Sequence, residues 1–309
     1  MIYLDENQTA KLISHEIAYL AVKDAFVAAT SGETTLFPVV NASGPQTDSM
    51  FSLKSACTST LVGWKTGTYW PENQSQNKSC HGTTTFLLSP ETGELVAAVS
   101  ASKVNAYRTA AADAVAVDYL ARKEASVLAV FGTGHQAEYD VLALSRVRNI
   151  SRVIVVGRNT DNTESFVVRL NDKGINAEAG SAQFACEHAD IIVTATTAKE
   201  PLFHADWVKA GTHISAMGAD KVGKQELPVE LYQYAKLFCD YKPQSLVIGE
   251  FQHTQNAAVT EIGKVIASRS SGRRSSDDIT IFDSSGIAVQ DLFVAAKLLE
   301  LVQVQAIGE

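Results

Sequence analysis

The sequence contains few cysteines, and their positions exclude the usual cysteine-based sites. Cys57, Cys80, Cys186 and Cys239 are the four cysteines among 309 residues, and no two of them have the CxxC spacing. A disulfide framework or a zinc knuckle needs more cysteines or paired Cys/His spacing. The seven histidines show no HExxH motif. The sequence therefore predicts no metal site and is typical of a protein of the reducing cytoplasm.

The sequence also lacks a long apolar run and an excess of positive charge. No apolar stretch approaches the roughly 20 residues that span a bilayer. The N-terminus, MIYLDENQTAKLIS, has no basic region followed by an apolar one. With 26 basic and 34 acidic residues the net charge is −8, which disfavours nucleic acids and anionic membranes as partners. We expect a soluble, untargeted cytoplasmic protein.

The composition is that of an ordinary globular chain, with 46% hydrophobic and 19% charged residues. Its length fits about two domains. Apolar residues recur at helical spacing from Ser14 to Gly32, and short β-rich runs separated by turns follow between Thr34 and Val99. The Ala-rich segment 107–122 is again helical, and so is the apolar stretch 293–307 near the C-terminus. We interpret the first third as an antiparallel sheet domain.

Strands and helices alternate after residue 123. The strands are too uniformly apolar to have a face in water, which is typical of a parallel sheet covered by helices on both sides. The predicted order is strand Ala125–Phe131, helix Glu138–Val147, strand Arg152–Val156, helix Thr163–Lys173 and strand Asp190–Ala195.

A glycine-rich turn follows the first of these strands. Gly132-Thr133-Gly134-His135-Gln136-Ala137 has the GxGxxA pattern and lies between a buried strand and a helix. The glycines would let the backbone approach a pyrophosphate at the helix N-terminus. In this context the pattern predicts a dinucleotide site, although a β-α turn without a nucleotide is the alternative.

The residue after the second strand predicts which dinucleotide binds. An acidic residue there would accept hydrogen bonds from the ribose 2′-hydroxyl, whereas an arginine would pair with a 2′-phosphate. Arg158 stands at this position, followed by Asn159 and Thr160 as further donors. The sequence favours NADP(H), with NAD(H) still possible, and a solvated arginine is the alternative interpretation.

Several strings together resemble the ornithine cyclodeaminase/mu-crystallin family: WKTGTYWPEN, SPETGEL, YRTAAADAVAVDYLAR, FGTGHQA, GADKVGKQEL and ITIFDSSGIAVQD. They stand in the family's order and cover nearly the whole chain. The resemblance implies a Rossmann domain joined to a substrate-binding and dimerisation domain that both chain ends form. It also implies cyclodeamination, amino-acid dehydrogenation or reduction of cyclic imines.

The resemblance assigns substrate roles to three residues. Lys65 matches the family lysine that holds the substrate carboxylate, and Arg108 the arginine that contacts substrate and cofactor. A lysine in an apolar strand must either point to water or meet a buried anion, and Arg108 could simply pair with an acid at the domain boundary. His81 corresponds to a histidine at the edge of the active site, but a strand residue without a role is the alternative.

The resemblance also assigns the proton transfer and the remaining cofactor contacts. Asp220 follows what should be a strand end, the edge where ligands bind in open α/β sheets, and matches the family's general acid/base. A turn or capping aspartate is the alternative. Together with Arg108, the cofactor contacts would come from Thr109, Gly132, Thr133, Gly134, His135, Gln136, Arg158, Asn159, Thr160, Thr196, Met217, Gly218, Lys224 and Ser284.

Two positions depart from the family pattern. The stretch Thr35–Val40 has no basic residue, where many members carry an arginine that clamps the carboxylate. Asp283 replaces the family's common lysine before the Ser-x-Gly turn. Both departures concern the substrate rather than the nucleotide.

We expect an α/β fold with a Rossmann domain over residues 110–284 and a substrate-binding, dimerisation domain over 1–109 and 285–309. The predicted activity is NADPH-dependent reduction of a cyclic ketimine carboxylate, pyrroline-2-carboxylate to L-proline or piperideine-2-carboxylate to L-pipecolate. Lys65 and Asp220 would be the catalytic residues. The alternatives are an NAD-dependent ornithine cyclodeaminase and a non-catalytic NADPH-dependent binding protein. Small imino or amino acids and a second copy of the chain are the expected partners.

Overall fold

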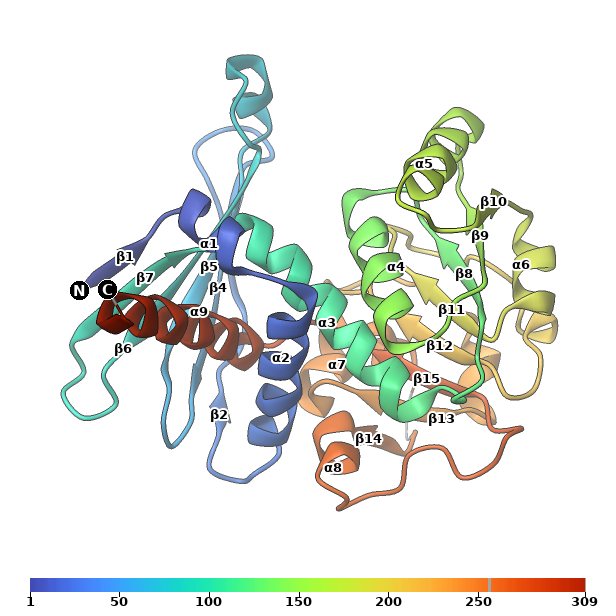
Figure 1. Cartoon of the computed structure of the whole chain (residues 1–309). Coiled ribbons are helices and arrows are strands. Elements are labelled where there is room, and N and C mark those ends of the chain that lie inside the picture. The colour runs from blue at the N-terminus through green and yellow to red at the C-terminus, as the bar shows by residue number, and fades with distance from the viewer. Residues whose placement is uncertain (255–256, 309) are drawn as a thin grey trace. The chain divides into compact units, whose positions relative to one another are not determined.

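Two separate β-sheets organise the chain, as the computed structural model in Figure 1 shows. The structure describes residues 1–254 and 257–308. One unit comprises Met1–Arg108 with Ile287–Glu309, and the other comprises Thr109–Gly286. The sequence placed these divisions after residues 109 and 284, and the final residue of the predicted first domain lies outside the described residues.

The first unit contains a seven-stranded sheet in the order β1-β7-β6-β5-β4-β2, with β3 paired to β4. All neighbours are antiparallel except β1, which runs parallel to β7. The antiparallel prediction for residues 34–99 therefore holds, while β1 was not expected. The strands are β1 (Ile2–Leu4), β2 (Thr35–Leu36), β3 (Val40–Ser43), β4 (Met50–Cys57), β5 (Val62–Tyr69), β6 (His81–Leu88) and β7 (Leu95–Ser100), with the 3-10 helix η1 (Pro71–Gln76) between β5 and β6.

The C-terminal helix α9 (Ala288–Gly308) packs on this sheet beside α2 (His15–Ala29) (Figure 1). Gly63 in β5 is needed for this packing, because a Cβ there would meet Leu292 of α9 at 3.1 Å and clash with the backbone of Phe86. Ser14 caps α2 by accepting a hydrogen bond from the backbone N–H of Ile17. The first turns of α9 are thus buried within their own unit, through Leu292, Val294 and Leu298, whereas Val304 is exposed.

Helix α3 (Ser102–Leu120) begins five residues earlier than the sequence predicted. The carboxylate of Glu6, in α1 (Glu6–Leu12), accepts hydrogen bonds from the backbone N–H groups of Ser102 at 3.1 Å and Lys103 at 2.8 Å. A distant carboxylate therefore caps the helix, and local sequence carries no sign of it.

The second unit contains an eight-stranded, fully parallel sheet in the order β10-β9-β8-β11-β12-β15-β13-β14. Its first five strands have the order of a doubly wound dinucleotide-binding fold, with the reversal between β8 and β11. The strands are β8 (Val127–Phe131), β9 (Arg152–Val156), β10 (Ala177–Ala179), β11 (Ile191–Thr194), β12 (His213–Ala216), β13 (Lys236–Cys239), β14 (Val259–Glu261) and β15 (Thr280–Asp283).

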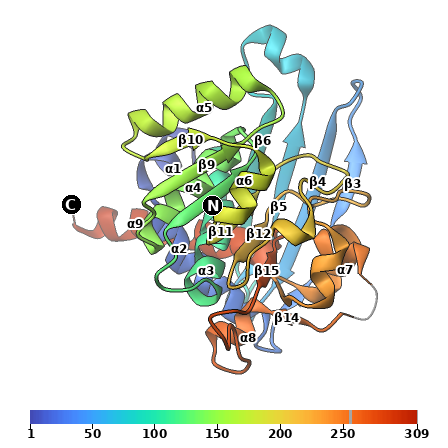
Figure 2. The same ribbon diagram turned by 90° about the vertical axis from the view of Figure 1, so that its right-hand side faces the viewer.

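Helices cover both faces of this sheet, as the sequence predicted. Figure 1 shows α4 and α5 on one side and α6 on the other, and Figure 2 shows α5 lying along β10 and β9. Of the helices that the structure describes, none is both long and apolar enough to cross a membrane. The helices are α4 (His135–Val147), α5 (Thr160–Asp172), α6 (Ala182–His188), α7 (Lys242–Ile248) and α8 (Ile262–Ile266), with η2 (Ala205–Trp207), η3 (Val229–Gln233) and η4 (Glu250–His253).

Candidate active site

The turn between β8 and α4 is shaped to receive an anion. Gly132 has φ +121°, and a Cβ there would lie 2.6 Å from the carbonyl oxygen of Ala195, so only glycine fits. Gly134 is the N-cap of α4 without a side-chain cap, and a Cβ at Gly134 would project into open space. The first N–H groups of α4 are thus available to a ligand. These features fit a dinucleotide pyrophosphate.

The side chains of Gln136 and His135 in this turn contact other residues of the second unit. The amide of Gln136 donates to Oδ1 of buried Asp140 at 2.8 Å, and the ring of His135 packs at 4.8 Å from that of Tyr139. We infer that both residues would contact a nucleotide through their backbone rather than through these side chains. Thr133 completes the turn between the two glycines.

Arg158 lies at the end of β9 with its side chain exposed. Within the described ranges it makes no hydrogen bond or ion pair, so its guanidinium is available to a ligand. Asn159 instead caps α5, accepting a hydrogen bond from the N–H of Asn162 at 2.8 Å, and Thr160 is the first residue of α5. The side-chain oxygen of Asn159 is therefore engaged in the fold.

The loops that follow β11 and β12 share a buried carboxylate that sequence reasoning missed. Glu226 accepts hydrogen bonds from Thr194 in β11, from Thr196 after β11 and from Gly218 after β12. Met217, buried beside Gly218, donates its backbone N–H to the carbonyl of Thr194 at 2.8 Å. The GADKVGKQEL string contains Glu226, but nothing in its spacing shows which loops the side chain would join.

Asp220 and Lys224 form an ion pair after β12. Lys224 Nζ lies 2.6 Å from Oδ1 of Asp220 and also donates to the carbonyl of Gly218 at 2.9 Å. The Asp220 side chain is half exposed and the Lys224 side chain is 18% exposed. Asp220 is thus accessible to a ligand, with the ammonium of Lys224 beside it.

The strand β15 ends at Asp283, which Ser284 follows, and both residues are buried. The N–H of Ser284 donates to the carbonyl of Ala216, and Ser245 donates to the Asp283 carboxyl. Burial, with the nearby charge of Asp240, raises the pKa of Asp283 well above its usual range. Burial thus favours the protonated form of the acid at the position where the resemblance implied a lysine.

The first unit contains a buried cluster of opposite charges around β5. Lys65, only 7% exposed, donates to Oδ1 of Asn105 at 2.6 Å and to Oδ1 of Asp291 at 3.2 Å. Arg108 Nε donates to the same oxygen of Asp291 at 3.0 Å, and its Nη1 to Gln290 at 3.4 Å. The solvent-facing alternative for Lys65 is wrong. Arg108 does pair with an acid, as its alternative supposed, and that acid also holds Lys65.

Positive groups outnumber the single carboxylate in this cluster. Lys54 stands directly opposite Lys65 in the β4–β5 register. Burial first, then the charge of Arg108, lowers the pKa of Lys65 to about 7. Although burial opposes it, the cations Arg108, Lys65 and Lys54 lower the pKa of Asp291. Within the part of the chain that the structure describes, Asp291 Oδ2 has no hydrogen-bond partner. The excess of positive charge fits an anionic ligand.

The structure does not bring His81 into this cluster. His81 is exposed at the start of β6, opposite Tyr69, and the two rings lie 4.8 Å apart. Thr85, four residues further along β6, is the partner of Lys65 in the register. At about 3.3 Å per residue the two positions are ~13 Å apart along the strand. Thr109, which follows Arg108 in α3, is the first residue of the second unit.

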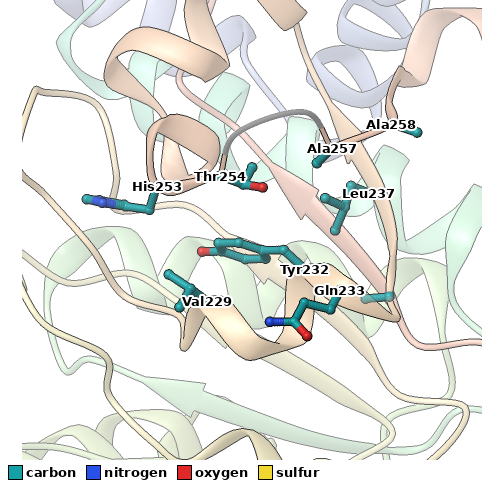
Figure 3. Close-up of a pocket in the computed structure, with 9 residues that line it drawn as sticks. Val229, Tyr232, Gln233, Leu237, His253, Thr254, Ala257 and Ala258 are labelled. Atoms are coloured by element: carbon teal, nitrogen blue, oxygen red, sulfur yellow. The ribbon is translucent and has the colours of Figure 1, made fainter.

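A pocket of about 590 Å³ lies in the second unit, and Figure 3 shows the ring of Tyr232 among the side chains that line it. Val229, Leu237 and His253 are also in its lining, and no predicted site residue is. The Tyr232 hydroxyl donates to buried Glu250 at 2.9 Å. The described residues include no group of three or more His, Cys, Asp or Glu side chains that could hold a metal ion.

Known proteins resemble this chain over its whole length. The iminosuccinate reductase of Paracoccus denitrificans is 35% identical over 100% of this chain and 99% of its own. Its crystal structure with NAD+ has a TM-score of 0.94 over 99% and 97% of the two chains. The structure of an archaeal alanine dehydrogenase dimer with bound NAD is 34% identical, with a TM-score of 0.91 over 99% and 97%.

A delta(1)-pyrroline-2-carboxylate reductase of Bacillus cereus is 30% identical, covering 100% of this chain and 99% of its own. The sequence profile described as the ornithine cyclodeaminase/mu-crystallin family matches residues 4–304. The Rossmann-type second unit and the sheet of the first unit agree with the folds of these structures, which confirms the predicted fold class. The chain belongs to the ornithine cyclodeaminase/mu-crystallin family.

Proposed function

We propose that the protein is an NAD(P)H-dependent oxidoreductase that reduces a 2-imino carboxylate to the corresponding amino acid. One observation carries this proposal: the buried cluster in which Lys65 and Arg108 share a single carboxylate, Asp291, and retain an excess of positive charge. A buried cation pair of this kind is poised to hold a carboxylate. The relatives' reductase and dehydrogenase activities support the same class of reaction.

Lys65 and Arg108 would neutralise the substrate carboxylate, and the planar fork of Arg108 would orient it. Asp220 would exchange the proton at the imine nitrogen, because it is accessible and Lys224 fixes its position. A bound nicotinamide cofactor supplies the hydride. The turn at Gly132 and Gly134 would hold its pyrophosphate, since this backbone leaves room for one.

Arg158 supports NADPH as the preferred cofactor. Its guanidinium is exposed and makes no hydrogen bond or ion pair across residues 1–254 and 257–308, so it can pair with a 2′-phosphate at little cost. The related structures with nucleotide carry NAD+ or NAD. The preference of this chain for the phosphorylated form therefore rests on Arg158.

Two substrates fit the cluster. The sequence favoured a cyclic ketimine such as pyrroline-2-carboxylate, which the B. cereus relative is named for. The iminosuccinate reductase relative instead favours a substrate with a second carboxylate, iminosuccinate. The missing arginine in Thr35–Val40 is consistent with a different arrangement of carboxylate contacts from that of many family members.

The purified protein should oxidise NADPH when given an imino acid. The assay compares pyrroline-2-carboxylate, iminosuccinate formed from oxaloacetate and ammonia, and L-ornithine, each with both nucleotides. Turnover of either imino acid supports the proposal and selects the substrate. Activity with L-ornithine alone would instead identify a cyclodeaminase, and binding of NADPH without any turnover would identify a binding protein.

We also propose a homodimer that is formed through the sheet of the first unit. Trp64 and Phe86 stack at 5.0 Å on the sheet face opposite Lys65 and are only partly buried. Alternation along β5 places them on that face. An archaeal relative is a dimer. Sedimentation should give about twice 33.2 kDa, and a Trp64→Glu variant should sediment as the monomer. A wild-type monomer at micromolar concentration would contradict the proposal.

A further inference from the structure

Glu226 connects two loops at the carboxyl edge of the parallel sheet. Its Oε1 accepts the backbone N–H and the hydroxyl of Thr196, both at 2.7 Å, in the loop after β11. Its Oε2 accepts the N–H of Gly218 at 2.9 Å, in the loop after β12, and the hydroxyl of Thr194 at 2.7 Å. The residue is fully buried, so these four donors replace water around the carboxylate.

A second buried carboxylate, that of Glu250, holds the backbone at Glu226. Glu250 accepts the backbone N–H groups of Glu226 at 3.1 Å and Leu227 at 2.8 Å, and the hydroxyl of Tyr232 at 2.9 Å. Glu250 therefore holds the backbone at residue 226, and the Glu226 side chain holds Thr196 and Gly218. The segment from Gly218 to Glu226, which includes Asp220 and Lys224, is closed at both ends by this arrangement.

The loops after β11 and β12 approach each other closely at Gly218. A Cβ on Gly218 would clash with the carbonyl oxygen of Thr196 and with Oε1 of Glu226. Glycine at this position therefore lets the loops approach until one carboxylate can bridge their N–H groups. Backbone hydrogen bonds also join the two loops, from the N–H of Gln225 to the carbonyl of Ala198 at 3.2 Å and from the N–H of Leu202 to the carbonyl of Glu226 at 2.8 Å. The Glu226 side chain adds a further connection at Thr196 and Gly218.

We propose that Glu226 is a positioning residue for the nicotinamide half of the dinucleotide. This inference rests on the proposed cofactor site. In the observed strand order the turn after β8 and the end of β9 serve one mononucleotide half, while the ends of β11 and β12 serve the other. Glu226 touches the loops of the second half and none of the residues assigned to the first, namely Gly132, Gly134 and Arg158.

The substitution Glu226→Gln tests the role with the least change in shape. An amide has one oxygen and one NH2 group, so in either orientation the NH2 group faces a backbone N–H, that of Thr196 or that of Gly218. One loop must move away. We expect affinity for NADPH to fall about tenfold or more, whereas affinity for 2′-phospho-ADP-ribose, which lacks nicotinamide, should stay within about twofold.

The exposed neighbour Glu230→Gln is the matched control and should leave both affinities unchanged. Isothermal titration of each variant with both ligands provides the readout without turnover. Equal loss of both affinities would mean that Glu226 only supports the fold, and unchanged NADPH affinity would also overturn the proposal. Failure of the wild-type protein to bind NADPH would instead refute the proposed function.

Thr194→Val provides a milder test if Glu226→Gln does not fold. It removes one donor to Oε2 inside β11 and leaves both loops chemically intact. We expect a smaller loss of NADPH affinity, about threefold, and again no change for 2′-phospho-ADP-ribose. If the valine variant binds NADPH as tightly as the wild type does, or loses both ligands together, the positioning role is refuted.

Discussion

Two buried carboxylates of this protein, one in each unit, have different surroundings. In the second unit, Glu226 has four donors from its own unit, and each of its oxygens is satisfied. In the first unit, Asp291 uses one oxygen for both Lys65 and Arg108, and its other oxygen has no partner among the described residues. Glu226 therefore holds two loops together, whereas two cations share one carboxylate oxygen at Asp291 and leave positive charge for an anionic ligand.

The largest expected effect is on turnover and comes from Asp220, whose side chain is accessible. Asp220→Asn keeps the shape but cannot exchange a proton, so turnover of an imino acid should fall by ~10²–10⁴-fold. NADPH affinity should remain near the wild-type value, because the substitution removes no group of the phosphate-binding turn. Stopped-flow measurement of hydride transfer isolates the chemical step from product release.

Near-normal hydride transfer in Asp220→Asn would show that the proton comes from solvent or from another residue. The matched control is Asp172→Asn, an exposed aspartate at the end of α5. It should retain the wild-type rate.

The second largest effect is on the binding of an anionic inhibitor, and it tests whether the Lys65 cluster binds a carboxylate. Burial lowers the pKa of Lys65 to about 7, so the ammonium is present below this pH and is lost above it. The inhibition constant of pyrrole-2-carboxylate, whose ring does not titrate in this range, should rise above pH 7 by up to about tenfold per unit. Lys65→Ala should bind the inhibitor weakly and with no such pH dependence.

A pH profile that is the same in the wild type and in Lys65→Ala would assign the titration to another group. A bound carboxylate favours the charged lysine, so the apparent pKa should rise in the complex. The apparent pKa would not rise if Asp291 were the only carboxylate that contacts Lys65 in the complex.

Arg158 is expected to give a smaller effect. A charge-assisted contact to the 2′-phosphate contributes ~1.5–3 kcal/mol, so the ratio of NADPH to NADH affinity should fall roughly tenfold or more in Arg158→Ala. Fluorescence titration with both nucleotides provides the ratio. An unchanged ratio would exclude Arg158 as the residue that recognises the phosphate.

The smallest effect concerns a buried acid without a proposed ligand. Burial raises the pKa of Asp113, in α3, to about 7. The folded protein thus holds a proton that the unfolded chain releases above about pH 4. Its stability should fall as the pH rises from about 4 to 7, by at most ~1.4 kcal/mol per unit from this group.

Asp113→Asn cannot ionise and should remove this contribution, so its stability advantage grows toward pH 7. Urea unfolding of both proteins at several pH values measures the difference. An identical pH dependence in both proteins would show that Asp113 is ionised in the folded state.

The sequence predicted what depends on local pattern. The alternation of strands and helices after residue 123 and the GxGxxA turn both correspond to observed elements, because burial and backbone freedom determine them locally. The family strings identified the whole chain as a family member. The roles of Lys65, Arg108 and Asp220 remain predictions.

What the sequence could not show depends on long-range contacts. Glu6 caps α3 from 96 residues away, and Asp291 reaches Lys65 across 226 residues. The role of Glu226 could not be predicted because its partners come from three separate segments of the chain. Each of these residues is a carboxylate that is visible in the sequence, but its hydrogen-bond donors are known only from the fold.

Transfer of hydrogen from the cofactor into the product is the most direct test of the proposed reduction. The purified protein is incubated with an imino acid and NADPH deuterated at both C4 positions, and the amino acid formed is examined by mass spectrometry. We predict one deuterium at the carbon that bears nitrogen, with formation reduced in Lys65→Ala and Asp220→Asn. An amino acid without deuterium, or no amino acid from either imino acid, would contradict the proposed reduction.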